Sequence, residues 1–99
     1  METIGELRKM LILEREELEN MKDINEYLDD ILEIRRIQTL TDEGWKTYEY
    51  ELLSTFGGPN IIINSEGIMG TWYEENDFIR HSEKSKLNFN KICDFLKYL

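Results

Sequence analysis

Residues 44–73 read GWKTYEYELLSTFGGPNIIINSEGIMGTWY, and this stretch decides the fold class. Side chains alternate with period two over Trp45–Thr55, which is the pattern of a strand that presents different residues to the two faces of a sheet. Two glycines and a proline then interrupt the chain, and the apolar run Ile61–Asn64 predicts a short buried strand. Ile68–Tyr73 returns as a third strand, in which Gly70 marks a bulge or a close backbone contact. Short connections of this kind favour antiparallel neighbours.

The segment after this stretch completes the sheet and adds a helix. Glu74–Asp77 is acidic and is predicted to be a loop, and Phe78–His81 is predicted to be a fourth, short strand. Apolar residues then recur at helical spacing to the end of the sequence. They predict a C-terminal helix that begins near Ser85 or Asn88 and covers one face of the sheet.

The N-terminal segment has a helical pattern. Thr3 and Glu6 form a capping box, in which two side chains satisfy free backbone N–H groups at a helix start. Apolar residues follow at helical spacing from Ile4 to Leu18. We therefore expect a first helix here, with an apolar stripe along it.

A second helix start is predicted at Asp23, which Glu26 follows three residues later. Two helices joined near residues 20–23 would form a hairpin, and this is the preferred interpretation. A single helix over residues 4–38 is the alternative. At 1.5 Å per residue it would be roughly 50 Å long, which exceeds the width of a globule of this size. Such a helix would dimerise along its apolar stripe.

Composition divides the chain at the same place as these patterns do. The first 43 residues hold 13 acidic and 6 basic side chains, whereas ten of the eleven aromatic residues follow Gly44. No linker rich in glycine, proline or serine separates the two parts. The sequence therefore predicts a single α+β domain over residues 1–99. Residues 1–40 form its acidic helical part, and residues 45–99 form an antiparallel sheet of about four strands plus the C-terminal helix.

Net charge and cysteine content exclude several classes of protein. The chain holds 12 lysine and arginine residues against 21 aspartate and glutamate residues, a net charge of -9. This balance argues against direct binding of nucleic acid or of anionic membranes. A single cysteine allows no disulfide within the chain, and no apolar run is long enough to span a membrane. With no secretory signal, the expected location is the cytoplasm.

No residue pattern predicts catalysis or a bound cofactor. His81 is the only histidine, and neither Ser82 nor Cys93 lies in a nucleophile motif. One histidine and one cysteine cannot make a structural zinc site without carboxylates, and the glycine pair lacks the lysine of a phosphate-binding loop. The expectation is therefore no enzyme, no cofactor and no metal. A small enzyme that uses His81, Glu49 or Glu51 is the least favoured alternative.

Acidic residues recur on the predicted second helix at steps of three or four. Side chains at that spacing stand about 5–6 Å apart on one face of a helix. Such a row resembles the line of charges along a nucleic-acid strand, and it would fit a basic groove that normally holds DNA or RNA. An ordinary solvated face of an acidic protein is the plainer alternative. The members of the row are Asp23, Glu26, Asp30 and Glu33.

A second candidate contact lies at the end of the third predicted strand. Trp72 and Tyr73 are neighbours on that strand, so they cannot both face inward, and one of them is expected to be exposed. An exposed aromatic side chain beside acidic residues is a typical interface anchor. The acidic residues are Glu74, Glu75 and Asp77.

The segment Leu52–Ile61, followed by Gly70–Tyr73, resembles a strand–loop–strand motif with a Gly-Gly-Pro-Asn loop in small proteins of phages and other mobile elements. The resemblance implies no catalytic residue. It does imply a setting, the cytoplasm of a prokaryotic host cell, because small acidic proteins of mobile elements often inhibit host defences. Anti-CRISPR and anti-restriction proteins that imitate nucleic acid are examples.

These features predict a small, non-enzymatic inhibitor whose partner is a basic protein, such as a nucleic-acid-binding effector of host defence. Carboxylates of the N-terminal helices and of residues 74–77 would make the contact, with Trp72 or Tyr73 as its anchor. The alternative is a homodimeric accessory or regulatory subunit assembled through the N-terminal helices.

Overall fold

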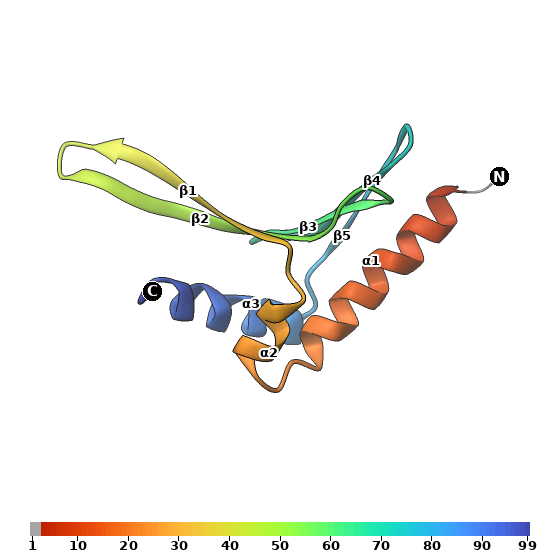
Figure 1. Cartoon of the computed structure of the whole chain (residues 1–99), viewed down its shortest axis with the longest axis horizontal. Helices are drawn as coiled ribbons and strands as arrows, with labels where there is room; N and C mark the ends of the chain where they lie inside the picture. The colour runs from red at the N-terminus through yellow and green to blue at the C-terminus, as the bar shows by residue number, and fades with distance from the viewer. Residues whose placement is uncertain (1–2) are drawn as a thin grey trace.

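A computed structural model describes the backbone of residues 3–99 and the side chains from residue 5 onward. The fold is α+β, as predicted: one antiparallel sheet lies on one side, and helices α1 and α3 lie under it (Figure 1). The strands follow one another in the sheet in chain order, β1-β2-β3-β4-β5. The predicted capping box includes Thr3, whose side chain lies outside the described part. The elements are α1 (Thr3–Glu19), α2 (Ile24–Asp29), β1 (Glu33–Thr41), β2 (Gly44–Thr55), β3 (Asn60–Ile63), β4 (Gly67–Trp72), β5 (Glu75–Arg80) and α3 (Glu83–Leu96).

The sheet has five strands, not four, because β1 replaces much of the predicted second helix. α2 has only six residues, and the chain is extended again from Glu33. The β1 sequence EIRRIQTLT is rich in β-branched residues, which lose side-chain freedom in a helix and pack well on a pleated surface. β1 pairs with β2 along its whole length. A second helix that carries the acidic row as far as Glu33, and a single helix over residues 4–38, are therefore both wrong.

Two tight turns shape the ends of the sheet. Gly44 lies in the β1–β2 turn with a φ of 107°, a left-handed conformation that glycine adopts without a steric cost. Tyr73 lies in the β4–β5 turn with a φ of 55°. Since Trp72 already pairs with Glu75, only Tyr73 and Glu74 form this turn. The prediction of a loop over Glu74–Asp77 is wrong, because most of that segment belongs to β5.

Helix α3 begins at Glu83, slightly earlier than predicted, because Ser82 caps it. The Ser82 hydroxyl accepts a hydrogen bond from the backbone N–H of Ser85 at 3.1 Å, and the Ser85 hydroxyl accepts one from the backbone N–H of Ser82 at 2.9 Å. This reciprocal pair satisfies two N–H groups that have no partner within the helix.

The core lies between the helices and the sheet. α1 contributes Leu7, Leu11 and Leu18, which are fully buried and therefore not available as a dimer seam. α1 approaches β4 closely at Gly70, where an added Cβ would lie 2.8 Å from Leu11 and 2.9 Å from Leu7. This confirms the close contact predicted at Gly70. The sheet and α3 complete the core with Tyr50, Leu52, Ile61, Ile63, Ile68, Ile79, Phe89, Ile92 and Leu96.

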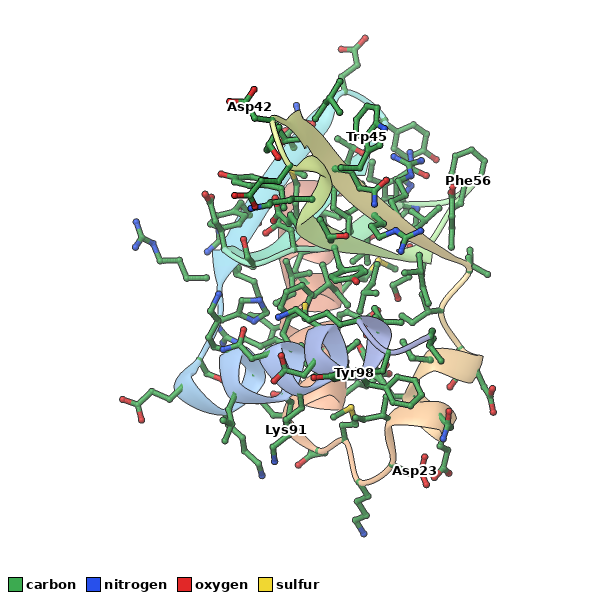
Figure 2. The ribbon with its side chains drawn as sticks, turned by 90° about the vertical axis from the view of Figure 1, so that its left-hand side faces the viewer. Asp23, Asp42, Trp45, Phe56, Lys91 and Tyr98 are labelled. Carbon is green, nitrogen blue, oxygen red and sulfur yellow. The ribbon has the colours of Figure 1, made fainter. Side chains whose placement is uncertain are left out.

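The β1–β2 hairpin extends away from this core as an arm, and the molecule measures 51 × 30 × 23 Å (Figure 1). Viewed from the end of the arm, Asp42 and Trp45 lie at the top of the molecule, and Asp23 lies at the bottom (Figure 2). The arm and the α1–α2 connection are therefore at opposite sides. No helix within residues 3–99 is long and apolar enough to cross a membrane.

Candidate functional site

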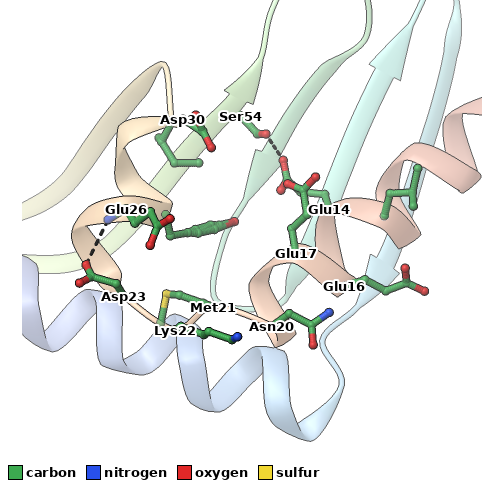
Figure 3. Close-up of a pocket in the computed structure, with 13 residues that line it drawn as sticks. Glu14, Glu16, Glu17, Asn20, Met21, Lys22, Asp23, Glu26, Asp30 and Ser54 are labelled. Atoms are coloured by element: carbon green, nitrogen blue, oxygen red, sulfur yellow. Dashed lines mark hydrogen bonds between the residues drawn. The ribbon is translucent and has the colours of Figure 1, made fainter.

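An open cavity of about 540 Å³ lies where the end of α1 faces α2 (Figure 3). Six of the side chains around it are carboxylates, and Lys22 is the one basic residue that lines it. The cavity is within the size range of pockets that hold organic ligands or inserted side chains. Its carboxylates are Glu14, Glu16, Glu17, Asp23, Glu26 and Asp30.

The chain builds the cavity by reversing direction after α1. α1 ends at Glu19, and Asp23 caps the start of α2 by accepting a hydrogen bond from the backbone N–H of Glu26 at 3.2 Å (Figure 3). The capping signal predicted at Asp23 is therefore confirmed. Because the second helix is so short, Asp30 lies at its end and turns back toward α1 across the cavity.

Glu14 is the buried carboxylate of the cavity, with only 7% of its surface exposed. The Ser54 hydroxyl on β2 donates a hydrogen bond to it (Figure 3). Burial, followed by the charge of Glu17, raises the pKa of Glu14 to about 8. The charge of Asp30 acts in the same direction. At neutral pH the side chain is therefore mostly protonated, because few positive groups compensate its charge.

Tyr27 places its hydroxyl group in the same buried region. This oxygen forms no hydrogen bond of regular geometry within the described residues, although it lies close enough to Glu14 for a hydrogen bond between the two side chains to affect the pKa of both. Burial raises the pKa of Tyr27, and the charges of Glu14 and Glu17 raise it further. A buried hydroxyl group without a well-formed hydrogen bond is unfavourable by roughly 1–3 kcal/mol, so a ligand group that donates a hydrogen bond to this oxygen would gain affinity.

The cavity carboxylates are not neutralised by basic groups of the chain. Among residues 5–99, the ion pairs join Arg8 to Asp77, Arg35 to Glu33, Lys46 to Glu43 and Lys97 to Asp94, and none includes a cavity carboxylate. Like charges held this close repel one another. The same part of the chain holds no cluster of three or more histidine, cysteine or acidic side chains arranged to hold a metal ion.

Three members of the predicted acidic row line the cavity, and the fourth does not. Asp23, Glu26 and Asp30 lie around α2, whereas Glu33 lies on β1 and is 3.5 Å from Arg35. The prediction of one straight row on one helix is therefore wrong. Asp23, Glu26 and Asp30 line the cavity instead.

The sequence-based site did not include the three cavity carboxylates of α1, which are Glu14, Glu16 and Glu17, and Glu14 is the buried one. Leu7, Leu11, Glu14 and Leu18 follow one another at steps of four, three and four, so Glu14 lies on the apolar stripe of α1. A carboxylate in such a stripe is a signal for a buried acid, because these positions face the core.

The second predicted contact, at the β4–β5 turn, lies apart from the cavity (Figure 1). Tyr73 is 79% exposed and Trp72 is partly buried, which confirms that one of the two is exposed. Their rings stack with centroids 5.7 Å apart. Glu74 and Glu75 are exposed.

Asp77 is not a free carboxylate of that turn. Arg8 on α1 binds it with two hydrogen bonds, at 2.8 Å from Nε and 2.5 Å from Nη2. These hydrogen bonds lower the pKa of Asp77. Its role in the fold is to join α1 to β5.

Two of the residues considered for catalysis, His81 and Glu49, form hydrogen bonds that include backbone groups. His81 donates from Nε2 to the carbonyl of Asn64 at 2.7 Å and accepts at Nδ1 from the Ser85 hydroxyl at 2.9 Å. Burial lowers the pKa of His81. Glu49 accepts hydrogen bonds from the backbone N–H and the hydroxyl of Ser65 at 3.2 and 2.8 Å. Cys93 is half-buried, and burial raises the pKa of its thiol.

Comparisons with protein-family models, with curated proteins and with solved structures found no match. The functional argument therefore rests on the cavity and on the surfaces around it.

Proposed function

We propose that the protein is a small acidic binding protein that takes a cationic segment of a partner protein into the cavity between α1 and α2. The observation that carries this proposal is the set of six carboxylates around one hollow, of which Glu14 is buried without a basic partner. A lysine or arginine side chain that enters the cavity would supply the missing positive charge.

Arginine fits this cavity better than lysine. Its planar guanidinium group donates several hydrogen bonds in fixed directions, and two carboxylates can each accept a pair of them. Glu14 and Glu17 lie on α1, and Asp30 faces them from the end of α2 (Figure 3). A guanidinium group between these elements would also lie near the Tyr27 oxygen and could donate a hydrogen bond to it, which makes this region the preferred position.

The wider role that we propose is inhibition of a basic, nucleic-acid-binding protein, of the kind found in anti-CRISPR or anti-restriction systems. A surface that normally holds phosphates presents arginine and lysine side chains, and these are the groups that the cavity would accept. The net charge of -9 would speed association with such a surface. The resemblance of the Gly-Gly-Pro-Asn region to proteins of mobile elements supports the same setting.

Titration calorimetry with a short oligoarginine peptide tests the proposal. Asp30→Lys places a positive charge at the cavity and is expected to weaken binding at least about tenfold, because each lost charge-assisted contact contributes roughly 1.5–3 kcal/mol. Glu74→Lys makes the same charge change at the distant β4–β5 turn and serves as the matched control. We expect it to change the affinity little at physiological salt, where charges separated by more than about 8 Å are screened.

Equal loss in the two variants would contradict the proposal, because binding would then follow net charge and not the cavity. Pull-down of proteins from a bacterial lysate, with wild type and Asp30→Lys compared side by side, extends the test to natural partners. Partners that are retained by wild type and lost with Asp30→Lys are expected to be basic.

A further inference from the structure

The exposed edge of the sheet is a surface that the proposed function does not use. β1 ends the strand order and pairs only with β2, so the backbone groups along its other side have no strand beside them. All nine of its residues are exposed. The other edge strand, β5, is instead packed against α1 and tied to it by the Arg8–Asp77 ion pair. A long exposed edge can pair with another chain unless charge, proline or a bulge protects it. β1 contains no proline, and the extra residue of the β-bulge opposite Ile37 and Gln38 is Tyr48 on β2, so β1 itself keeps a regular alternation.

Apolar side chains on this edge are unusually exposed. Ile34, Ile37 and Leu40 are exposed by 42%, 37% and 62%, and Trp45, which is directly opposite Leu40 on β2, by 66%. Directly paired residues of antiparallel strands project from the same face. Ile34 and Leu40 therefore share a face with Trp45, which is labelled near the end of the arm in Figure 2.

A row of apolar side chains crosses the entire sheet on that face, and its last member, on β1, is exposed to solvent. The paired residues Ile79, Ile68, Ile63 and Leu52 follow one another from β5 to β2, and all are buried. Ile34 is the next member of the row, opposite Leu52, and it is the first one exposed. One more strand with an apolar residue beside Ile34 would cover it.

A second copy of β1 supplies that residue in a symmetric register. Ile37 is the midpoint of Glu33–Thr41, so antiparallel pairing about a two-fold axis at Ile37 uses all nine residues. Ile34 then lies opposite Leu40 of the second copy, and Trp45 of that copy follows Leu40. The apolar row would continue across the new boundary without a break.

Charge is also compatible with this register. Arg35 would lie opposite Thr39 and Arg36 opposite Gln38 of the second copy, and Glu33 opposite Thr41. A two-fold axis at Arg35 or at Arg36 would instead place two arginines directly opposite each other, which is destabilising. The register with its axis at Ile37 therefore pairs the most residues and places no two like charges directly opposite each other.

We propose that two copies of the protein pair through β1 to form a homodimer with a continuous ten-stranded antiparallel sheet and Ile37 at the two-fold axis. The dimer surface extends along β1 from Glu33, where the connection from α2 ends, to the end of the arm (Figure 1). The dimer would contain two acidic cavities, one in each copy.

Sedimentation equilibrium over a range of concentrations tests this proposal. Wild type is expected to approach twice the chain mass of 11.9 kDa. Ile37→Lys and Ile37→Glu each place like charges opposite each other at the axis, so each variant alone is expected to remain a monomer. An equal mixture of the two is expected to recover the dimer, because lysine then faces glutamate. Leu87→Lys, which changes another exposed apolar residue on α3, is the control and is expected to dimerise like wild type.

Cysteine cross-linking tests the register itself. Ile34→Cys and Leu40→Cys are each made in a Cys93→Ala background. The register places residue 34 of one copy opposite residue 40 of the other, so a mixture of the two variants is expected to form disulfides between copies. Each variant alone is expected to form few. A monomeric wild type at high micromolar concentration would overturn the proposal. So would a dimer that Ile37→Lys leaves intact, or cross-links that form equally well in the unmixed variants.

The dependence on salt concentration distinguishes dimerisation from binding of a cationic peptide. Dimerisation joins two chains of charge -9, so added salt is expected to strengthen it, whereas binding of a cationic peptide is expected to weaken. Asp30→Lys is expected to reduce peptide binding and to leave the dimer unchanged. Failure of one result therefore does not imply failure of the other.

Discussion

At the scale of single residues, Glu14 has the most unusual environment. It is a carboxylate on the buried side of α1, beside Glu17 and the buried Tyr27 hydroxyl, and its pKa is raised to about 8. Desolvation favours its protonated form, and so do the neighbouring negative charges. Folding therefore binds a proton here, and the stability of the fold depends on pH.

Glu14→Gln is expected to remove this pH dependence. In the unfolded chain Glu14 titrates near 4.5, and in the folded chain near 8. Its protonated form therefore contributes full stability below pH 4.5, and this contribution falls as pH rises toward 8. The loss is on the order of 5 kcal/mol. Glutamine keeps an acceptor for Ser54 and cannot ionise, so the variant is expected to be more stable than wild type at pH 9. Urea unfolding at several pH values measures the difference.

The matched control is Glu16→Gln, which removes an exposed carboxylate of the same cavity. It is expected to leave the dependence between pH 4.5 and 8 in place. A wild-type stability that stays constant over this interval would contradict the raised pKa of Glu14.

Gly70 shows a steric requirement at the same scale. Its missing side chain lets Leu7 and Leu11 of α1 lie against β4. Gly70→Ala would place a Cβ within 3.0 Å of both leucines, so we expect a loss of about 1–3 kcal/mol from overpacking. Gly58→Ala is the control, since nothing lies within 4 Å of its added Cβ. Thermal unfolding of the two variants measures the difference, and equal stability would contradict the close contact.

At the scale of helices and strands, the sequence predicted elements well where the pattern is local. β2, β3 and β4 were predicted within a few residues, because glycine, proline and turn residues mark their ends. β1 was not, since Ile34 and Ile37 fit a helical spacing and a strand alike until their partner strand is known. Pairing with β2 is a contact between distant residues, and no local pattern reveals it.

The junction of the β3–β4 turn with α3 is a second element-scale feature, and His81 holds it together. His81→Phe removes its hydrogen bonds to Asn64 and Ser85, and we expect it to destabilise the fold by about 1–3 kcal/mol. The pKa of His81 is lowered from 6.5, so the unfolded chain binds the proton more readily. Its contribution to stability is present above pH 6.5 and is lost as pH falls below that value.

Chemical unfolding of Glu14→Gln with and without His81→Phe measures this slope, because the two groups change stability in opposite directions with pH. Without Glu14, the histidine-containing chain is expected to lose stability between pH 6.5 and pH 5, and the phenylalanine variant is expected to lose less. Equal losses would mean that His81 keeps an ordinary pKa.

At the scale of the whole molecule, two surfaces of different character lie on opposite sides. The cavity gathers carboxylates from α1, α2 and the start of the following segment, and β2 contributes Ser54. The arm presents an apolar strand edge. The sequence predicted acidic residues as the contact, and three of the four in the proposed row line the cavity. It could not predict their concave arrangement, because that depends on where α2 ends and on how β1 returns to the sheet.

Binding of a cationic segment to the cavity is also expected to depend on pH. A cationic segment favours ionised Glu14, so binding should release a proton when the free protein holds one. We expect the affinity for an oligoarginine peptide to rise as pH increases from 6 to 9, and to change much less in Glu14→Gln. Calorimetry in buffers of different ionisation enthalpy counts the released protons. Proton uptake on binding, or no exchange at pH 7, would contradict this coupling.

The most direct measurement is an NMR titration of the Glu14 side-chain carboxyl carbon, with and without the oligoarginine peptide. If the cavity takes up a cation beside this residue, its titration midpoint lies near 8 in the free protein and moves down by a unit or more when the peptide is bound. A midpoint that stays where it is while the peptide binds would place the cation elsewhere and contradict the account.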